Sequence, residues 1–117
     1  MITYEKLQSL VDLKIERVEI PEWNDFVYVK EFSGKSRDVF ANFYQAALKK
    51  NSDVGIRALL VVLSACDESG KVIFNESDAE LINSKNADAI EKIYNVAMKL
   101  NGLSGEASKQ AQETFQG

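Results

Sequence analysis

The chain has 117 residues, a length that fits one domain and allows a modest core without disulfide bonds. Its net charge of −4, from 18 acidic and 14 basic residues, disfavours nucleic-acid binding, which usually needs a basic face. The sequence has no histidine and no glycine-rich phosphate loop, which removes the commonest catalytic base and nucleotide motif. We therefore expect a protein that binds another protein, is not an enzyme, and uses no cofactor or metal.

The expected compartment is the cytosol. The N-terminus lacks a basic region followed by an apolar stretch, and the longest apolar run, 58–63, is too short to span a bilayer. The single cysteine, Cys66, cannot form an internal disulfide, which favours a reducing compartment. It ends an apolar run, so we expect a buried packing residue rather than a reactive thiol.

The first third of the chain predicts a short helix followed by a β-hairpin. Apolar residues recur at helical spacing within residues 3–12, and Thr3 can cap that helix. Residues 17–20 alternate polar and apolar side chains, which indicates a strand, and Pro21 ends it. A second strand is expected over residues 26–32, which are rich in aromatic and β-branched side chains.

Two longer helices are expected next. Ser33 can cap a helix that ends at Asn51 and has one apolar face, formed by Val39, Phe40, Phe43, Tyr44, Ala47 and Leu48. Asp53 can cap a second helix, 54–66, which is apolar on nearly all sides and must be covered by other elements. Periodicity alone would also fit a buried strand here, but the length favours a helix.

The remaining chain predicts a turn and three more helical segments. Gly70 permits a turn, and Asn75 or Ser77 can start a short helix that ends near Asn83. An amphipathic helix follows from about residue 87, and Gly102 can end it in a left-handed cap with Leu103 as apolar partner. Residues 105–117 form a polar C-terminal segment, expected to be weakly helical or disordered.

The predicted fold is therefore mostly α with a small N-terminal β-hairpin (α+β), a compact helical domain of about five helices. Residues 1–104 are expected to form a single domain. Carboxylate pairs such as Asp67 with Glu68 lie in turns and are expected to be solvated.

Residues 65–76 resemble an EF-hand calcium loop. Asp67, Ser69, Gly70 and Glu76 fall at loop positions three, five, six and twelve, but Ala65 replaces the first carboxylate. Because tight sites need an intact ligand set, we prefer a plain glycine turn between two elements. A degenerate calcium-responsive module remains an alternative.

Three stretches, in this order and spacing, resemble the tail assembly chaperones of long-tailed, siphovirus-type phages, functional relatives of the lambda G protein. The first is 20–30, continued by 32–34 and 37–40. The second is 57–67, continued by Gly70, Phe74 and Asp78, and the third is 93–97, continued by 100–103. The likeness covers most of residues 14–104.

The resemblance implies a phage- or prophage-encoded chaperone that acts in the host bacterial cytoplasm. Such proteins bind the tape measure protein and keep it soluble until the tail tube polymerises, and they are absent from the mature virion. In many relatives a ribosomal frameshift makes a longer form that would recruit tail tube subunits. Whether this chain has such a form, and whether it self-associates, stays open. A structural tail component is the alternative.

The partner-binding residues expected from the sequence are Trp23, Phe26 and Tyr28. Trp23 lies in the hairpin connection, where a ring either folds back onto the hairpin or contacts a partner. Phe26 and Tyr28 lie in the second strand, in the hairpin whose edge is one of the expected contact surfaces.

Overall fold

The computed structural model describes residues 1–52 and 54–103. In chain order the elements are α1 (Tyr4–Ser9), β1 (Ile15–Ile20), η1 (Pro21–Trp23), β2 (Asp25–Lys30), α2 (Gly34–Lys50), α3 (Ile56–Ser64), β3 (Ala65–Cys66), η2 (Glu76–Asp78), α4 (Ala79–Asn83) and α5 (Ala87–Leu100). The predicted α+β class is confirmed. The predicted C-terminal segment, 105–117, lies outside the described residues.

The strands form one antiparallel sheet in the order β1-β2-β3, which leaves β1 at an edge. The β1–β2 register runs from Ile15 opposite Lys30 to Ile20 opposite Asp25. The second strand is shorter than the predicted 26–32, and Phe32 is instead buried just beyond it. β3, which the sequence did not indicate, adds a two-residue third strand to the predicted hairpin through Tyr28 and Val29.

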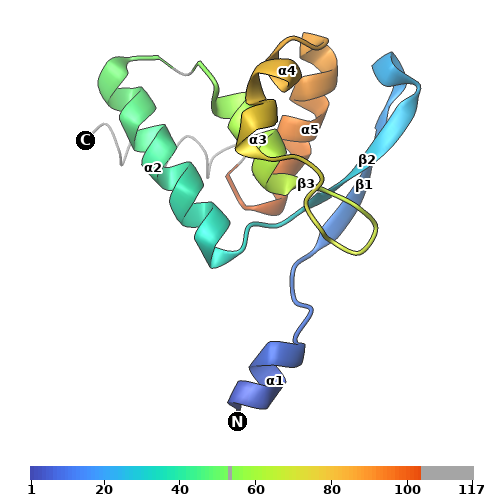
Figure 1. Ribbon diagram of the computed structural model, residues 1–117, viewed down its shortest axis with the longest axis vertical. Coiled ribbons are helices and arrows are strands. Elements are labelled where there is room, and N and C mark those ends of the chain that lie inside the picture. Colours follow the sequence, from blue (N-terminus) through green and yellow to red (C-terminus); the bar gives the residue numbers. More distant parts are fainter. Residues whose placement is uncertain (53, 104–117) are drawn as a thin grey trace.

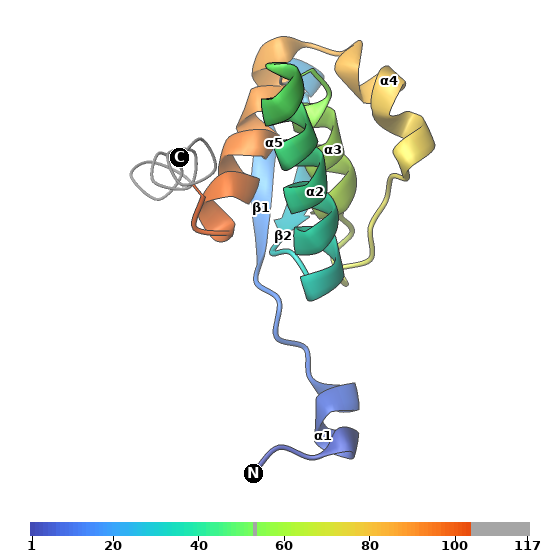
Figure 2. The same cartoon turned by 90° about the vertical axis from the view of Figure 1, so that its left-hand side faces the viewer.

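Helix α5 packs on β1 and β2, α3 packs on α5, and α2 and α4 pack on α3. In Figure 1 the hairpin lies to the right of α3 and α5, and in Figure 2 α2 is nearest the viewer, with α3 and α5 behind it and the strands behind those. The core joins four buried strand residues, Val18, Ile20, Val29 and Ala65, to the buried sides of α3 and α5. Among the most buried are Ile20, Val29, Leu60, Val61 and Ile93.

The apolar segment after residue 53 is a helix, as predicted, but it is shorter than 54–66. It begins at Ile56 and ends at Ser64, and Ala65 and Cys66 leave it to become β3. Gly55 occupies the N-cap, whereas Asp53, the predicted cap, lies outside the described residues. Six of the nine α3 residues are buried, as an apolar helix without a polar face requires.

The other helix ends follow the predicted signals. The Oγ atom of Ser33 accepts a hydrogen bond from the Ser36 N–H at 3.2 Å, and Asn75 caps η2. At the end of α5, Leu103 N–H donates to Met98 O at 2.8 Å and Gly102 N–H donates to Lys99 O at 3.1 Å. This is the paired bonding of a Schellman motif.

α1 projects away from the rest of the molecule. Thr3 caps it as predicted, accepting a hydrogen bond from Lys6 N–H at 3.2 Å, but the helix ends at Ser9 and buries no residue. Both views show it below the body, at the end of an extended segment (Figures 1 and 2). None of the helices that the structure describes combines the length and the apolar character needed to cross a membrane.

Candidate protein-binding surface

The hairpin presents one face to the helices and the other to solvent. Along β1, Val18 and Ile20 are buried in the core, whereas Arg17 and Glu19, which alternate with them, are exposed. Directly paired residues lie on the same side of a sheet, so Tyr28 opposite Arg17 and Phe26 opposite Glu19 share this outer face. We call these four residues the hairpin patch: Arg17, Glu19, Phe26 and Tyr28.

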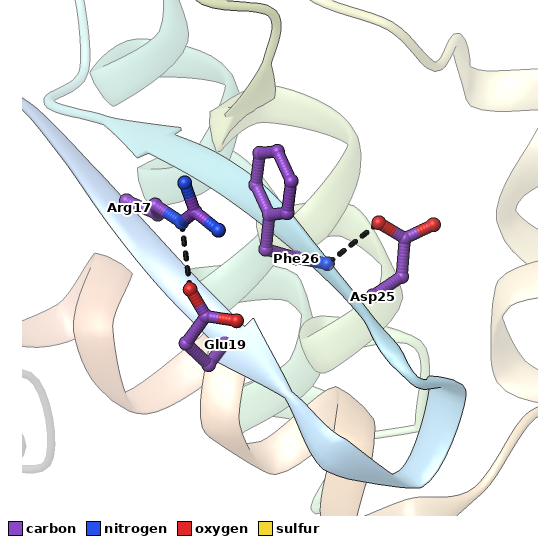
Figure 3. A network of polar contacts seen from close by, with 4 residues as sticks. All are labelled: Arg17, Glu19, Asp25 and Phe26. Carbon is purple, nitrogen blue, oxygen red and sulfur yellow. Dashed lines mark hydrogen bonds and ion pairs between the residues drawn. The ribbon is translucent and has the colours of Figure 1, made fainter.

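Contacts within the hairpin patch fix the positions of its side chains. The rings of Phe26 and Tyr28 meet edge to face with centroids 5.7 Å apart, and the Arg17 guanidinium carbon lies 3.7 Å from the Phe26 ring centroid. Arg17 Nε also contacts Glu19 Oε1 at 2.6 Å, and Phe26 N–H donates to Asp25 Oδ1 at 2.8 Å (Figure 3).

These contacts matter more for geometry than for stability. An exposed ion pair contributes about 0–1 kcal/mol, and an exposed cation–π contact about 0.5–1 kcal/mol. Phe26 nevertheless stays 41% exposed. The patch therefore offers a pre-positioned aromatic and arginine surface, the composition that protein interfaces favour.

Two of the three residues predicted from the sequence thus lie together, and the third does not join them. Trp23 ends η1 in the connection of the hairpin and is 39% exposed. Among the described residues, the ring contacts of the hairpin link Phe26 to Tyr28 and do not include Trp23. Arg17 was missed, although its place in the alternating stretch 17–20 was a usable signal.

The hairpin connection is tied to the helical layer. Glu22 in η1 forms an ion pair with Lys92 of α5. Lys92, as hydrogen-bond donor, holds the pKa of the Glu22 carboxyl below its usual value. Asn24 then takes the left-handed conformation, φ 50°, that closes the turn into β2. The position of Trp23 is therefore set by the contact between η1 and α5.

A second apolar surface lies between the helices. A groove of about 550 Å³ lies between α2, α3 and the η2–α4 segment. It is lined by Val39, Asn42, Phe43, Gly55, Leu59, Val62, Glu76 and Ala79. We call it the helical groove. On the predicted apolar face of α2, Phe40 and Ala47 are buried, whereas Phe43 remains 38% exposed.

The comparisons with known proteins agree with this architecture. No protein-family model and no curated protein sequence matches the chain. The solved structure of the bacteriophage HK97 tail assembly chaperone does match, with a TM-score of 0.60 over 86% of this chain and 95% of that one, at 16% sequence identity. The chain has the fold of a phage tail assembly chaperone. The likeness predicted from three sequence stretches is therefore confirmed in three dimensions.

Within this tail assembly chaperone fold, the EF-hand-like stretch contains a turn that is organised by the side chain of Asp67. Asp67 Oδ1 accepts hydrogen bonds from Ser69 N–H at 2.9 Å, Ser69 Oγ at 2.7 Å and Lys71 N–H at 3.0 Å. The Ser69 hydroxyl and the Lys71 amide lower the pKa of Asp67. Residues 54–103, which contain this turn, hold no cluster of three or more acidic, cysteine or histidine side chains suited to a metal.

Cys66 is a packing residue of the chaperone fold, as predicted. It belongs to β3, pairs with Tyr28 and is only 1% exposed. Burial raises the pKa of its thiol. Because the thiolate is the reactive form, this cysteine is held in its unreactive state.

Proposed function

We propose that this chain is a tail assembly chaperone of a siphovirus-type phage or prophage. It would bind the tape measure protein in the host bacterial cytoplasm, keep it soluble until the tail tube polymerises, and be absent from the mature virion. The observation that carries the proposal is the fold shared with the HK97 tail assembly chaperone over 95% of that chain. Under this proposal the chain works by binding and not by catalysis.

The surface of the molecule supports a binding role. A long helical partner with exposed apolar stripes aggregates unless those stripes are covered. The hairpin patch supplies Phe26, Tyr28 and Arg17, the residue types that dominate interface energies. The net charge of −4 would help to keep a coated complex dissolved.

Co-expression with the tape measure protein of the same genome tests the proposal. We expect that protein to be insoluble alone and soluble in a complex with this chain. Phe26→Ala should weaken the complex by roughly tenfold, about 1–2 kcal/mol, because it removes the exposed ring of the patch. Competition on the soluble complex, in which unlabelled wild type or variant displaces labelled wild-type chain, would measure the change.

The matched control is Lys49→Ala, an exposed position at the end of α2 far along the chain from the hairpin. It should leave affinity unchanged. A tape measure protein that is equally soluble without this chain would contradict the proposal. Mass spectrometry that finds the chain as a stoichiometric part of purified virions would instead support a structural tail component.

A further inference from the structure

The helical groove is apolar along α3. Helix α3 packs against α2 and also against η2 and α4, so it forms the floor between two walls (Figure 2). Leu59 and Val62 of α3 line the groove, and Phe43 of α2 leaves part of its ring uncovered in it. Val54, directly before the lining residue Gly55, is 81% exposed. A hollow that groups several apolar side chains in this way is typical of a binding site.

The α2 wall of the groove is basic. Val39 and Phe43 line the groove, and residues four or seven positions apart share one face of a helix. Lys35 and Lys50 therefore continue the groove face of α2 at its two ends, and both are exposed. Over its whole length α2 carries four basic residues and one acidic residue. A bound molecule would meet positive charge along this wall.

The opposite wall, formed by η2 and α4, is acidic. Glu76 lines the groove, and Glu80 follows one helical turn later at an exposed position. The two segments together, 76–83, contain three acidic residues and no basic one. Of the ion pairs between described residues, none includes these two carboxylates or the two lysines at the ends of the α2 wall. The opposite charges of the walls are therefore not neutralised by such pairs.

An apolar floor between a basic and an acidic wall fits one amphipathic helix. Its apolar stripe would cover the floor, as in other complexes of a helix in a groove. Acidic side chains on one edge of the stripe would face α2, and basic side chains on the other edge would face η2 and α4. A helix bound in the reverse direction would bring like charges together on both sides, which disfavours that direction.

We propose that the helical groove binds one amphipathic helix of the tape measure protein in a single direction, with the acidic edge of that helix beside α2. The identity of the partner rests on the proposed function, whereas the charge pattern and the direction follow from the groove. The groove is a different surface from the hairpin patch, so the partner would be held at two places.

Competition on the soluble complex, with labelled wild-type chain, tests the role of the groove. Asn42→Trp fills the groove from an exposed position and therefore spares the core. It should weaken the complex by roughly tenfold or more, because the helix loses its place. Gln45→Trp is the matched control, since it makes a similar change at an exposed position of α2 that does not line the groove. It should bind as the wild type, and circular dichroism checks that both variants are folded.

The charge pattern is tested by Lys35→Glu combined with Lys50→Glu, which makes both walls acidic. We expect the complex to weaken by roughly fivefold, because attraction at two positions becomes repulsion. The loss should shrink at high salt, which screens exposed charges. The control is Arg37→Glu combined with Lys99→Glu, which has the same net charge but changes the far side of α2 and the last turn of α5. It should bind as the wild type.

Disulfide trapping tests the direction of the bound helix. The segment of the tape measure protein that the wild type, but not Asn42→Trp, protects from proteolysis is synthesised with a cysteine at one end or the other. The peptide with an N-terminal cysteine should cross-link to only one of Lys35→Cys and Lys50→Cys. The peptide with a C-terminal cysteine should cross-link to the other.

The outcomes separate this inference from the proposed function. A complex that forms but is bound equally well by Asn42→Trp would overturn the groove as a binding site and leave the proposed function intact. A tape measure protein that is equally soluble without this chain would overturn the proposed function, and this inference with it. Equal cross-linking of one peptide to both lysine positions would overturn the single direction.

Discussion

At the scale of single residues, one oxygen atom of Asp67 organises the turn that follows β3. Its three hydrogen bonds come from the side chain and backbone of Ser69 and from the backbone of Lys71, all within the turn. An aspartate that satisfies nearby backbone donors in this way makes an Asx turn, which needs no metal. The calcium-like spacing of residues 65–76 is thus explained by turn chemistry.

We predict that this turn makes stability depend on pH. The folded pKa of Asp67 is lowered, so its contribution is present above the unfolded value and is lost as pH falls through the folded value, below about pH 4. The melting temperature of the wild type should therefore fall more in this range than that of Asp67→Asn, whose amide oxygen can accept the same bonds without titrating.

Thermal melts followed by circular dichroism from about pH 2 to pH 7 would measure the difference. Asp67→Ala should melt below both proteins at neutral pH. Identical pH profiles for the wild type and Asp67→Asn would contradict the assignment. Addition of calcium at neutral pH should leave the wild-type melting temperature unchanged, and an increase would favour the calcium-responsive module instead.

At the scale of the elements, the C-terminus of α5 depends on one backbone conformation. Gly102 has φ +68°, and its N–H and that of Leu103 bond to the last turn of the helix. A side chain in this left-handed region costs about 1–2 kcal/mol, because its Cβ crowds the backbone. Glycine avoids this cost, which explains why the helix ends here.

We predict that Gly102→Ala lowers the free energy of unfolding by about 1–2 kcal/mol. Urea denaturation would measure it. Gly34→Ala is the matched control, since a Cβ at Gly34 meets no atom within 4 Å and its φ is not positive. That change should be neutral or stabilise by up to about 1 kcal/mol. Equal destabilisation by both would show that the Gly102 conformation is not the cause.

Elements with strong local signals could be predicted from the sequence. Alternation and Pro21 marked the hairpin, Ser33 marked the start of α2, and Gly102 marked the end of α5. β3 could not be found, because two residues carry no period and their pairing partners, Tyr28 and Val29, lie far away in the sequence. Its strand state is decided by the tertiary structure.

The residues of the candidate binding surface were likewise only partly predictable from the sequence. Phe26 and Tyr28 alternate along one strand, so their shared face follows from the sequence, whereas Trp23 lies outside the strand and its place depends on the contact of η1 with α5. The helical groove could not be predicted, because it depends on how closely α2 approaches α3. Local pattern places Phe43 on the apolar face of α2 but does not tell how much of it is covered.

At the scale of the whole molecule, one side chain joins the sheet to the end of the helical layer. Asn101, after α5, accepts a hydrogen bond from Phe32 N–H through Oδ1 at 2.9 Å and donates through Nδ2 to Ala97 O at 2.9 Å. It therefore connects the segment that follows β2 with the last turn of α5. The two bonds are partly buried, so water replaces them poorly.

We predict that Asn101→Ala lowers the free energy of unfolding by about 1–2 kcal/mol, because the Phe32 N–H loses its partner. Urea denaturation with far-UV circular dichroism would measure the loss. Asn95→Ala, at an exposed position on the same helix, should be neutral or slightly stabilising, since alanine favours helices. A loss for Asn95→Ala as large as that for Asn101→Ala would contradict a specific role of Asn101.

The edge position of β1 affects how readily the protein aggregates at high concentration. An uncovered strand can recruit the backbone of any other extended chain and seed a growing fibre. Here three of the six residues of that strand, Glu16, Arg17 and Glu19, carry exposed charges, which must be desolvated before another strand can add. The exposed charges of β1 thus oppose the addition of a further strand at the side of the sheet next to the hairpin patch, and with it the growth of an amyloid fibre.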